Sequence, residues 1–271
     1  AAPLMSALTA DCIARGLDLN DGGARFPANH GIAGMGIGVT ADSLAAVKRF
    51  VYERGRFTLA ELRRMLDANF AGFERERRLL LTEAPKYGNG DDEVDALAAR
   101  ATLDFGRECL RYRTPRGGSY WGLMAANVSN IPAGREVGAS PDGRFALQPL
   151  SDAASPTFGR DLAGLTGVIR SVSRLPYRVC PGGNVVNVKL HPSAVAGDRG
   201  LDALASLIRA AFDMGAVQLQ FNTVDRRVLE EARAHPEEHR SLVVRVSGFS
   251  SHFVSLDRAV QEDILARTEY R

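Results

Sequence analysis

The chain has 271 residues, of which 45% are hydrophobic and 24% are charged, and its formal net charge is +2. This composition is typical of a globular protein long enough for one large domain or two small ones. The near balance of charges argues against a nucleic-acid-binding surface. No apolar run reaches the ~18 residues that a membrane-spanning helix needs, so we expect no membrane insertion.

Two further features bear on the setting of the protein. Cys12, Cys109 and Cys180 lie far apart with no pairing pattern, which favours a reducing, cytoplasmic location. The chain does not start with methionine, and residues 1–5 lack the basic segment of a signal peptide. We therefore expect the chain to begin within a longer protein.

The N-terminal part is predicted to be mainly helical. Leu4, Leu8, Cys12 and Ile13 have helical spacing, so we expect a helix over residues 4–15 with Cys12 packed in its apolar face. The glycine-rich segment 31–38 lacks both a preceding strand and the G-x-G-x-x-G order of a dinucleotide-binding loop. A close-packed loop is the favoured interpretation there.

Three longer helices are expected next. The first covers residues 42–51, with Asp42 or Thr40 as its cap and one apolar face formed by Leu44, Val47, Phe50 and Val51. The segment Thr58-Leu-Ala-Glu61 is a capping box, and the helix that it opens is expected to continue until shortly before Pro85. Its predicted buried residues are Leu62, Met65, Leu66, Phe70 and Phe73. The third helix is expected from about 92 to 112.

After Gly117-Gly118 the pattern becomes mixed. Short apolar runs at 119–130, 164–172 and 184–190 alternate with Gly/Pro turns, and the last resembles a buried strand. Helices are predicted at 201–214 and 225–234.

The segment 217–222 alternates strictly, which predicts a strand with Gln218, Gln220 and Asn222 on one face. Two interpretations stay open for this strand. The amides contact a buried loop or a substrate, or the strand is simply half-exposed.

Two other chemistries were considered. His235 and His239 have the spacing of two metal ligands on a helix, but Pro236 interrupts that helix and no third ligand is near in sequence, so we expect no metal site. His252 follows Ser250-Ser251, yet residues this close in sequence rarely form a hydrolase triad. His252 is predicted to form part of the wall near Gly248.

The segment 242–253 suggests a different chemistry. A strand-like run leads into Gly248, and an amphipathic helix follows at about 257–267. A turn glycine is one interpretation. The other is a glycine whose α-carbon loses a hydrogen atom, because a radical there can flatten without a side chain in the way. The sequence Arg245-Val-Ser-Gly-Phe-Ser-Ser-His-Phe253 resembles the glycyl-radical motif of the pyruvate formate-lyase superfamily.

Further segments are similar to the C-terminal half of the same superfamily, so the resemblance covers nearly the whole chain. They are Asp11–Gly16, Ala41–Ala46, Ala84–Asn89, Gly138–Arg144 and Pro149–Asp152. The resemblance implies an α/β fold, half of a ten-stranded barrel whose two five-stranded halves are antiparallel and wrapped by helices. Residues 1–116 are then the helical part, and residues 117–271 the barrel-strand part with a glycyl-radical domain at about 150–271.

The resemblance also implies a function. A separate radical-SAM activating enzyme makes a post-translational glycyl radical on Gly248, with no bound cofactor, and the radical passes to a cysteine thiol in a dry, apolar interior. None of the three cysteines matches that thiyl cysteine, and the general-base carboxylate that accompanies it in many members is also missing. We therefore expect the N-terminal portion of the same enzyme to supply the thiyl cysteine, in a homodimer that acts on a small-molecule substrate.

The reaction type stays open at this stage. The segment 250–256 and the end 267–270 are closer to the eliminase and decarboxylase branch, which favours a lyase, dehydratase or decarboxylase. Formate C-acetyltransferase is an alternative. Another is a non-catalytic replacement subunit that carries only the radical, although the long helical block disfavours it.

Overall fold

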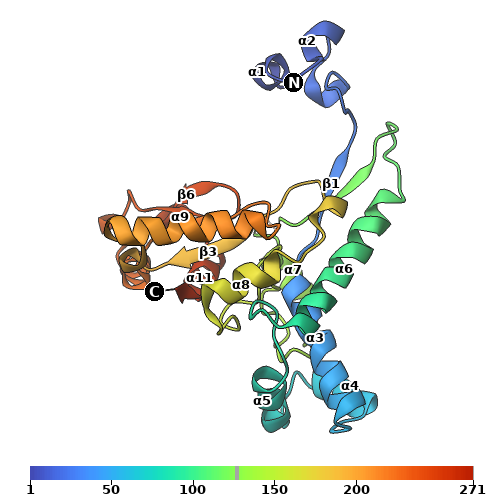
Figure 1. Cartoon of the computed structure of the whole chain (residues 1–271), viewed down its shortest axis with the longest axis vertical. Coiled ribbons are helices and arrows are strands. Elements are labelled where there is room, and N and C mark those ends of the chain that lie inside the picture. Colours follow the sequence, from blue (N-terminus) through green and yellow to red (C-terminus); the bar gives the residue numbers. More distant parts are fainter. Residues whose placement is uncertain (126–127, 271) are drawn as a thin grey trace.

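The computed structural model describes residues 1–125 and 128–270 (Figure 1). Its α-helices are α1 (Pro3–Ala7), α2 (Cys12–Arg15), α3 (Ile37–Val47), α4 (Leu59–Asp67), α5 (Glu74–Thr82), α6 (Asp92–Leu110), α7 (Asn130–Glu136), α8 (Gly164–Val172), α9 (Gly197–Asp213), α10 (Arg226–Ala234) and α11 (Arg258–Ala266). Its strands are β1 (His30–Ala33), β2 (Tyr120–Leu123), β3 (Asn187–Leu190), β4 (Gln220–Asn222), β5 (Val243–Arg245), β6 (Ser250–His252) and β7 (Glu269–Tyr270). A π-helical segment, η2 (Lys48–Glu53), continues α3, and short 3₁₀ helices occupy η1 (Leu19–Asp21), η3 (Tyr177–Val179), η4 (Pro192–Val195), η5 (Pro236–Glu238) and η6 (Phe253–Ser255).

The strands form three small sheets. β1 pairs with β2 in parallel, β3 lies between β4 and β7 and is parallel to both, and β5 and β6 form an antiparallel hairpin. A bridge between Met124 and Asn184 joins the end of β2 to the segment before β3. The mixed α/β class is as predicted. These short sheets do not confirm the more specific prediction of half of a ten-stranded barrel.

The main core lies where α3 and α6 pack against each other and against β2, β3 and α8. Its largest buried members include Tyr87, Met124 and Tyr177. A second core, with Phe50 and Phe70, lies under α4 and α5, and a third, with Val246 and Phe253, lies between α10, α11 and the β5–β6 hairpin. The third core fixes the hairpin that carries Gly248.

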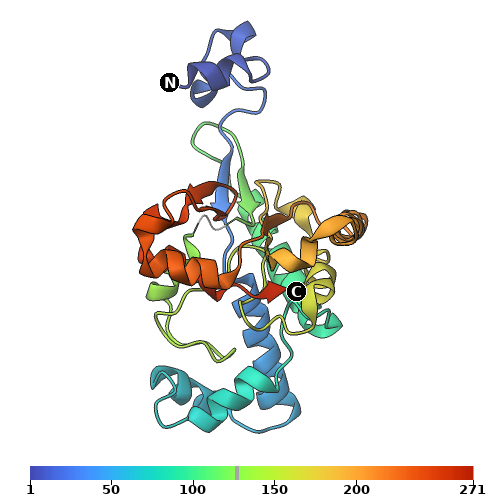
Figure 2. The same cartoon turned by 90° about the vertical axis from the view of Figure 1, so that its left-hand side faces the viewer.

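The N-terminal helix departs from the prediction. It divides into α1 and α2, because Asp11 adopts a positive φ of 75° that an α-helix cannot contain. Both views place α1 and α2 at the far end of the molecule, away from the other elements (Figures 1 and 2). Leu4, Leu8 and Ile13 are 74%, 77% and 76% exposed, so the predicted apolar face is not covered by the described residues. Cys12 is buried, as predicted.

The glycine-rich segment 31–38 is only partly a loop. Its first residues belong to β1, although the sequence before it did not predict a strand. The close packing is confirmed, because a Cβ on Gly34 would lie 2.8 Å from the Phe105 ring. Gly36 has a φ of 81° and ends the loop, so α3 begins at Ile37. Asp42 is therefore buried inside α3 and is not its cap.

The helix predicted to follow Thr58 is two helices. Asn69 and Phe70 have positive φ values of 48° and 61°, which end the first helix and turn the chain into α5. The predicted capping box is confirmed. The Thr58 hydroxyl accepts a hydrogen bond from Glu61 N at 3.1 Å, and the Glu61 carboxylate accepts one from Thr58 N at 2.8 Å.

We expect Thr58→Ala to lower the free energy of unfolding by about 1 kcal/mol, because it leaves a helix N–H without its side-chain partner. Urea unfolding monitored by circular dichroism measures the change. Thr82→Ala in the exposed last turn of α5 is the matched control, since its hydroxyl only donates to the Arg78 carbonyl of its own helix. An equal loss in both variants would contradict the capping role.

Later elements follow the prediction more closely. α6 and α10 lie within a few residues of their predicted bounds, and α9 begins four residues early. The run 164–172 is helix α8. Within the run 119–130, residues 126–127 lie outside the described residues, and the rest contributes β2 and the start of α7.

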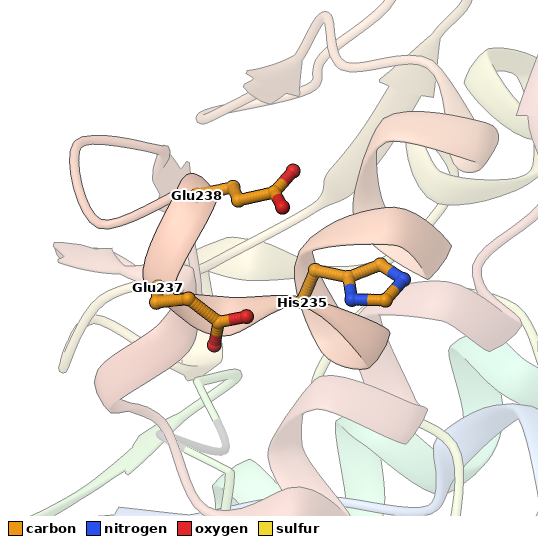
Figure 3. Close-up of side chains that lie close together, drawn as sticks. All are labelled: His235, Glu237 and Glu238. Carbon is orange, nitrogen blue, oxygen red and sulfur yellow. The ribbon is translucent and has the colours of Figure 1, made fainter.

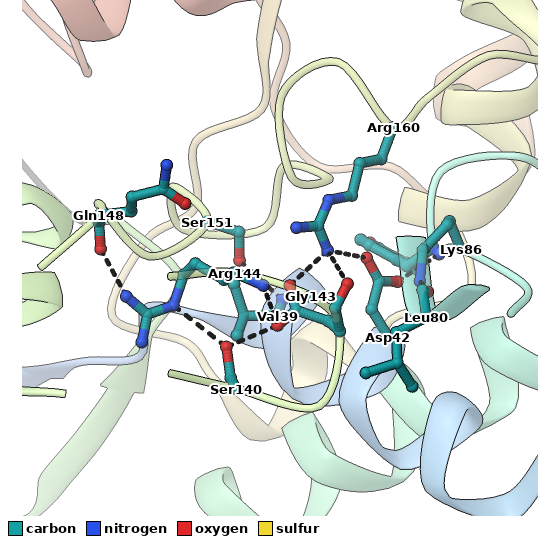
Figure 4. A network of polar contacts seen from close by, with 12 residues as sticks. Val39, Asp42, Leu80, Lys86, Ser140, Gly143, Arg144, Gln148, Ser151 and Arg160 are labelled. Atoms are coloured by element: carbon teal, nitrogen blue, oxygen red, sulfur yellow. Dashed lines mark hydrogen bonds and ion pairs between the residues drawn. The ribbon is translucent and has the colours of Figure 1, made fainter. Parts of the chain in front are cut away.

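A buried polar network joins the helical part to the loop before α8 (Figure 4). Asp42 accepts a hydrogen bond from Tyr87 N at 2.7 Å and lies 3.6 Å from the Arg160 guanidinium, which also pairs with Asp142. Lys86 donates to the Leu80 carbonyl at 2.7 Å. Burial raises the pKa of the Asp42 carboxyl to about 7 and lowers that of the Lys86 ammonium to about 8.

This network predicts a pH dependence of stability. The unfolded Asp42 carboxyl has a pKa of about 4, so between about pH 5 and pH 7 the folded state holds a proton that the unfolded state has lost. The free energy of unfolding then falls as pH rises, by about 2 kcal/mol over this interval for Asp42 alone. Urea unfolding of the wild-type protein and of Asp42→Asn at pH 5 and at pH 7 measures the contribution of Asp42 to this change. Equal pH dependence in both proteins would contradict it.

Candidate active site

Gly248 lies at the tip of the β5–β6 hairpin. Arg245 pairs with Ser250 across the hairpin, and Val246 N donates to the Phe249 carbonyl at 2.8 Å, which leaves Ser247 and Gly248 as the two-residue turn. Gly248 has a φ of 83°, a conformation that favours glycine. The local sequence therefore requires a glycine here for the turn itself.

The surroundings of Gly248 are apolar on one side and open on the other. Val246 and Phe253 are buried beneath the turn, and a Cβ built on Gly248 would meet only a Val185 methyl, at 3.9 Å. Gly248 itself is exposed, and Phe249 is 45% exposed. The dry interior expected around Gly248 is thus not formed by the described residues of this chain. His252, which was predicted to form part of the wall, is exposed like Gly248.

A chain of two amides, one buried and one half-buried, leads away from the Gly248 backbone. Gly248 N donates to Gln220 Oε1 at 2.7 Å, Gln220 Nε2 donates to Asn187 Oδ1, and Asn187 Nδ2 donates to the Asp152 carboxylate. Gln220 and Asn187 are direct neighbours across the β3–β4 pair. Of the two interpretations left open for segment 217–222, contact with a loop is found for Gln220, although that loop is exposed at Gly248.

The stem of the hairpin is held by a second amide and a buried arginine. Asn222 exchanges two hydrogen bonds with the backbone of Arg245, at 2.7 and 2.8 Å. Arg267 donates to the carbonyls of Val246 at 2.7 Å and Arg245 at 3.3 Å, and it lies 3.4 Å from the Asp263 carboxylate. The ends of β4 and α11 thus converge on the two residues that precede the turn.

The two buried carboxyl groups of this site, Asp152 and Asp263, have raised pKa values. Burial raises the pKa of Asp152 to about 6, and the Arg267 guanidinium opposes that rise. Burial also raises the pKa of Asp263, against the effects of Arg267 and of a hydrogen bond from Asn130. One oxygen of Asp152 accepts no hydrogen bond from the described residues.

Comparison with known proteins identifies the family. Residues 1–134 match the family model "Pyruvate formate lyase-like", and residues 150–254 match the model "Glycine radical", whose segment includes the hairpin turn. The chain belongs to the glycyl radical enzyme family. The segment Arg245–Phe253, whose resemblance to the glycyl-radical motif singled out Gly248, lies within the second match.

Characterised glycyl radical enzymes are similar over almost the entire chain. Trans-4-hydroxy-L-proline dehydratase of Clostridioides difficile is 40% identical over 98% of this chain and 34% of its own length. Isethionate sulfite-lyase of Oleidesulfovibrio alaskensis is 36% identical over 100% of this chain and 33% of its own length. The glycerol-bound B12-independent glycerol dehydratase of Clostridium butyricum superposes with a TM-score of 0.93, at 42% identity, over 99% of this chain and 34% of its own. The chain thus spans about a third of the length of these relatives.

The cysteines of this glycyl radical enzyme chain are all buried away from the turn. A Cβ on Gly122 or on Gly106 would lie 2.9 Å from Cys180 Sγ, which places that thiol against α6 and β2. Burial raises the pKa of Cys180 to about 11 and also raises that of Cys109. No cysteine among the described residues lies within 4 Å of the Cβ position built on Gly248.

The two histidines of segment 235–239 do not come together as metal ligands. His235 instead lies near Glu237 and Glu238, with ligand atoms within 4.8 Å of one another (Figure 3). All three side chains are exposed, and exposed acidic groups often gather in this way without an ion. In the part of the chain that the structure describes, no helix combines the length and apolar character needed to cross a membrane.

Three residues of the site escaped the sequence analysis. Asp152 and Asn187 lay in segments whose chemistry the sequence left unassigned, and Arg267 was given no role at the end of the predicted amphipathic helix. The i, i+4 spacing of Asp263 and Arg267 was the available signal, but the same spacing marks ordinary surface ion pairs.

Proposed function

We propose that Gly248 stores the radical of a glycyl radical enzyme of lyase type. The observation that carries the proposal is the geometry of the turn. The glycine is held at its N–H by a buried amide and is itself exposed, and beyond its two chain neighbours the nearest described atom to an added Cβ is a Val185 methyl at 3.9 Å. A radical-SAM activating enzyme is the proposed partner that reaches this carbon.

The radical chemistry balances as hydrogen-atom transfers. A carbon radical on the activating enzyme takes one hydrogen atom from the Gly248 α-carbon, so one C–H bond forms and one breaks. The Gly248 radical later takes a hydrogen atom from a cysteine thiol, which becomes a thiyl radical. That cysteine is proposed to come from the N-terminal portion of the same enzyme, which would also cover the open side of the turn in a homodimeric assembly.

Dehydration of a small hydroxylated substrate is the proposed reaction. The thiyl takes a hydrogen atom from a substrate carbon, the C–O bond on the neighbouring carbon breaks, and hydroxide leaves as water with the proton given up by the hydroxyl or amine group of the radical-bearing carbon. The product radical then takes the hydrogen atom back from the thiol, so no net oxidation occurs. Two relatives that act by dehydration, at 40% and 42% identity, support this choice over C–S cleavage or decarboxylation.

The whole gene product, activated anaerobically by its radical-SAM enzyme, tests the reaction class. We expect water loss from a vicinal diol, glycerol or hydroxyproline in a panel that also contains isethionate, and pyruvate with coenzyme A. Acetyl-coenzyme A and formate as the products would favour the formate C-acetyltransferase alternative. A radical signal without turnover, restored by adding an oxygen-damaged partner enzyme, would favour a replacement subunit.

A further inference from the structure

Gln220 is the side chain that contacts the backbone of the motif glycine. It is 3% exposed, lies in β4, and accepts the hydrogen of Gly248 N at 2.7 Å. The NH₂ group of the same amide donates to Asn187 Oδ1, and the NH₂ group of Asn187 donates to the carboxylate of Asp152, a residue that is 1% exposed. Three side chains, from β4, β3 and the loop after residue 150, therefore form one chain of hydrogen bonds that ends at Gly248; Gln220 and Asp152 are buried, and Asn187 is half-buried.

The donor and acceptor roles in this chain of hydrogen bonds are determined by the groups at its two ends. Gly248 N–H can only donate, so Gln220 must present its oxygen to it and its NH₂ group to Asn187. Asn187 must then present its own oxygen to Gln220 and its NH₂ group to Asp152, whose carboxylate can only accept. Each hydrogen bond in such a chain polarises the next, so the charge on Asp152 strengthens the bond at Gly248.

We propose that Gln220 is a positioning residue for the glycyl radical, oriented by Asn187 and Asp152. The inference rests on the proposed function of Gly248. The unpaired electron is shared between the α-carbon, the amide nitrogen and the carbonyl only while these groups are coplanar. Gln220 holds the amide hydrogen in one direction and so opposes rotation of the peptide group out of that plane.

Electron paramagnetic resonance of the activated whole enzyme in D₂O tests this role. We expect Gln220→Leu to raise the quadrupole coupling of the Gly248 N–D deuteron, because a stronger hydrogen bond lowers that coupling. We also expect the anaerobic half-life of the radical to fall roughly fivefold, the factor that corresponds to losing one ordinary hydrogen bond. Gln220→Glu should retain both values, because burial favours its protonated form, whose carbonyl accepts from Gly248 and whose hydroxyl donates to Asn187.

Two further variants make the result decisive. Gln218→Leu is the matched control, because the Gln218 side chain accepts a hydrogen bond from Val186 N, just before β3, and not from Gly248. Asp152→Asn keeps an acceptor for Asn187 but removes the charge, and it should shift the deuteron coupling in the same direction by a smaller amount. If Gln220→Leu does not fold, the deuteron coupling of Asp152→Asn tests the role of Gln220 instead. Unchanged coupling in the variants, with a normal wild-type doublet, would overturn the inference alone, whereas a wild-type enzyme without a doublet would overturn the proposed function.

Discussion

Gly248→Ala is expected to abolish both the radical and turnover while leaving a folded protein. The space around the turn accepts a methyl group, since its nearest described neighbour outside the turn is Val185 at 3.9 Å. The positive φ of 83° makes an alanine there unfavourable by about 1–2 kcal/mol, a loss that a domain of this size tolerates. The methyl nevertheless prevents the α-carbon from flattening between its amide and carbonyl.

Gly197→Ala is the matched control for this prediction. Gly197 also has a positive φ, of 64°, and an added Cβ there would have no neighbour within 4 Å. Both variants should lose similar stability in urea unfolding, yet only Gly248→Ala should lose the radical and product formation. Turnover by an activated, folded Gly248→Ala enzyme would show that another residue stores the radical.

Arg267→Met is expected to be the most destabilising substitution in the site. The Arg267 side chain is 3% exposed, donates to two carbonyls of the hairpin stem, and is the cation that faces both Asp152 and Asp263. Methionine fills a similar volume but leaves two buried carboxyls without their cation. Breaking a buried pair in this way typically lowers the free energy of unfolding by about 3–5 kcal/mol.

Arg258→Met on the same helix is the comparison for Arg267. The Arg258 side chain is 82% exposed and pairs with Glu262 at 3.1 Å, so its loss should change the free energy of unfolding by less than about 1 kcal/mol. Denaturant unfolding of the two variants at pH 7 measures the contrast. Similar values for both would mean that water already reaches the Arg267–Asp263 pair and compensates the charges.

The sequence predicted the features that depend on local chemistry. The capping box at Thr58 is decided by neighbours three residues away, and it is found in the structure. The alternation of 217–222 is confirmed as a strand only for Gln220–Asn222. The glycine at position 248 is similarly local, since a two-residue turn with positive φ favours it. The sequence therefore located the turn, but it left open which group the amide of Gln220 contacts.

Features that depend on distant segments were not predictable in the same way. Asp42 looked like a helix cap, but Gly36 starts the helix one and a half turns earlier and places this carboxyl against Tyr87 and Arg160. Arg267 follows the last residue of α11, and nothing in the sequence of that helix shows that the hairpin stem packs over it. Burial of a charge is a property of the tertiary structure, and only the described contacts reveal it.

The central claim is that the unpaired electron resides on the α-carbon of Gly248. The most direct measurement is the electron paramagnetic resonance spectrum of the activated whole enzyme, prepared once with ordinary glycine and once with glycine deuterated at the α-carbon. We expect a doublet, split by the single remaining α-hydrogen, that collapses to a narrow singlet on deuteration and is absent in Gly248→Ala. A doublet that deuterated glycine leaves unchanged, or that persists in Gly248→Ala, would contradict this account.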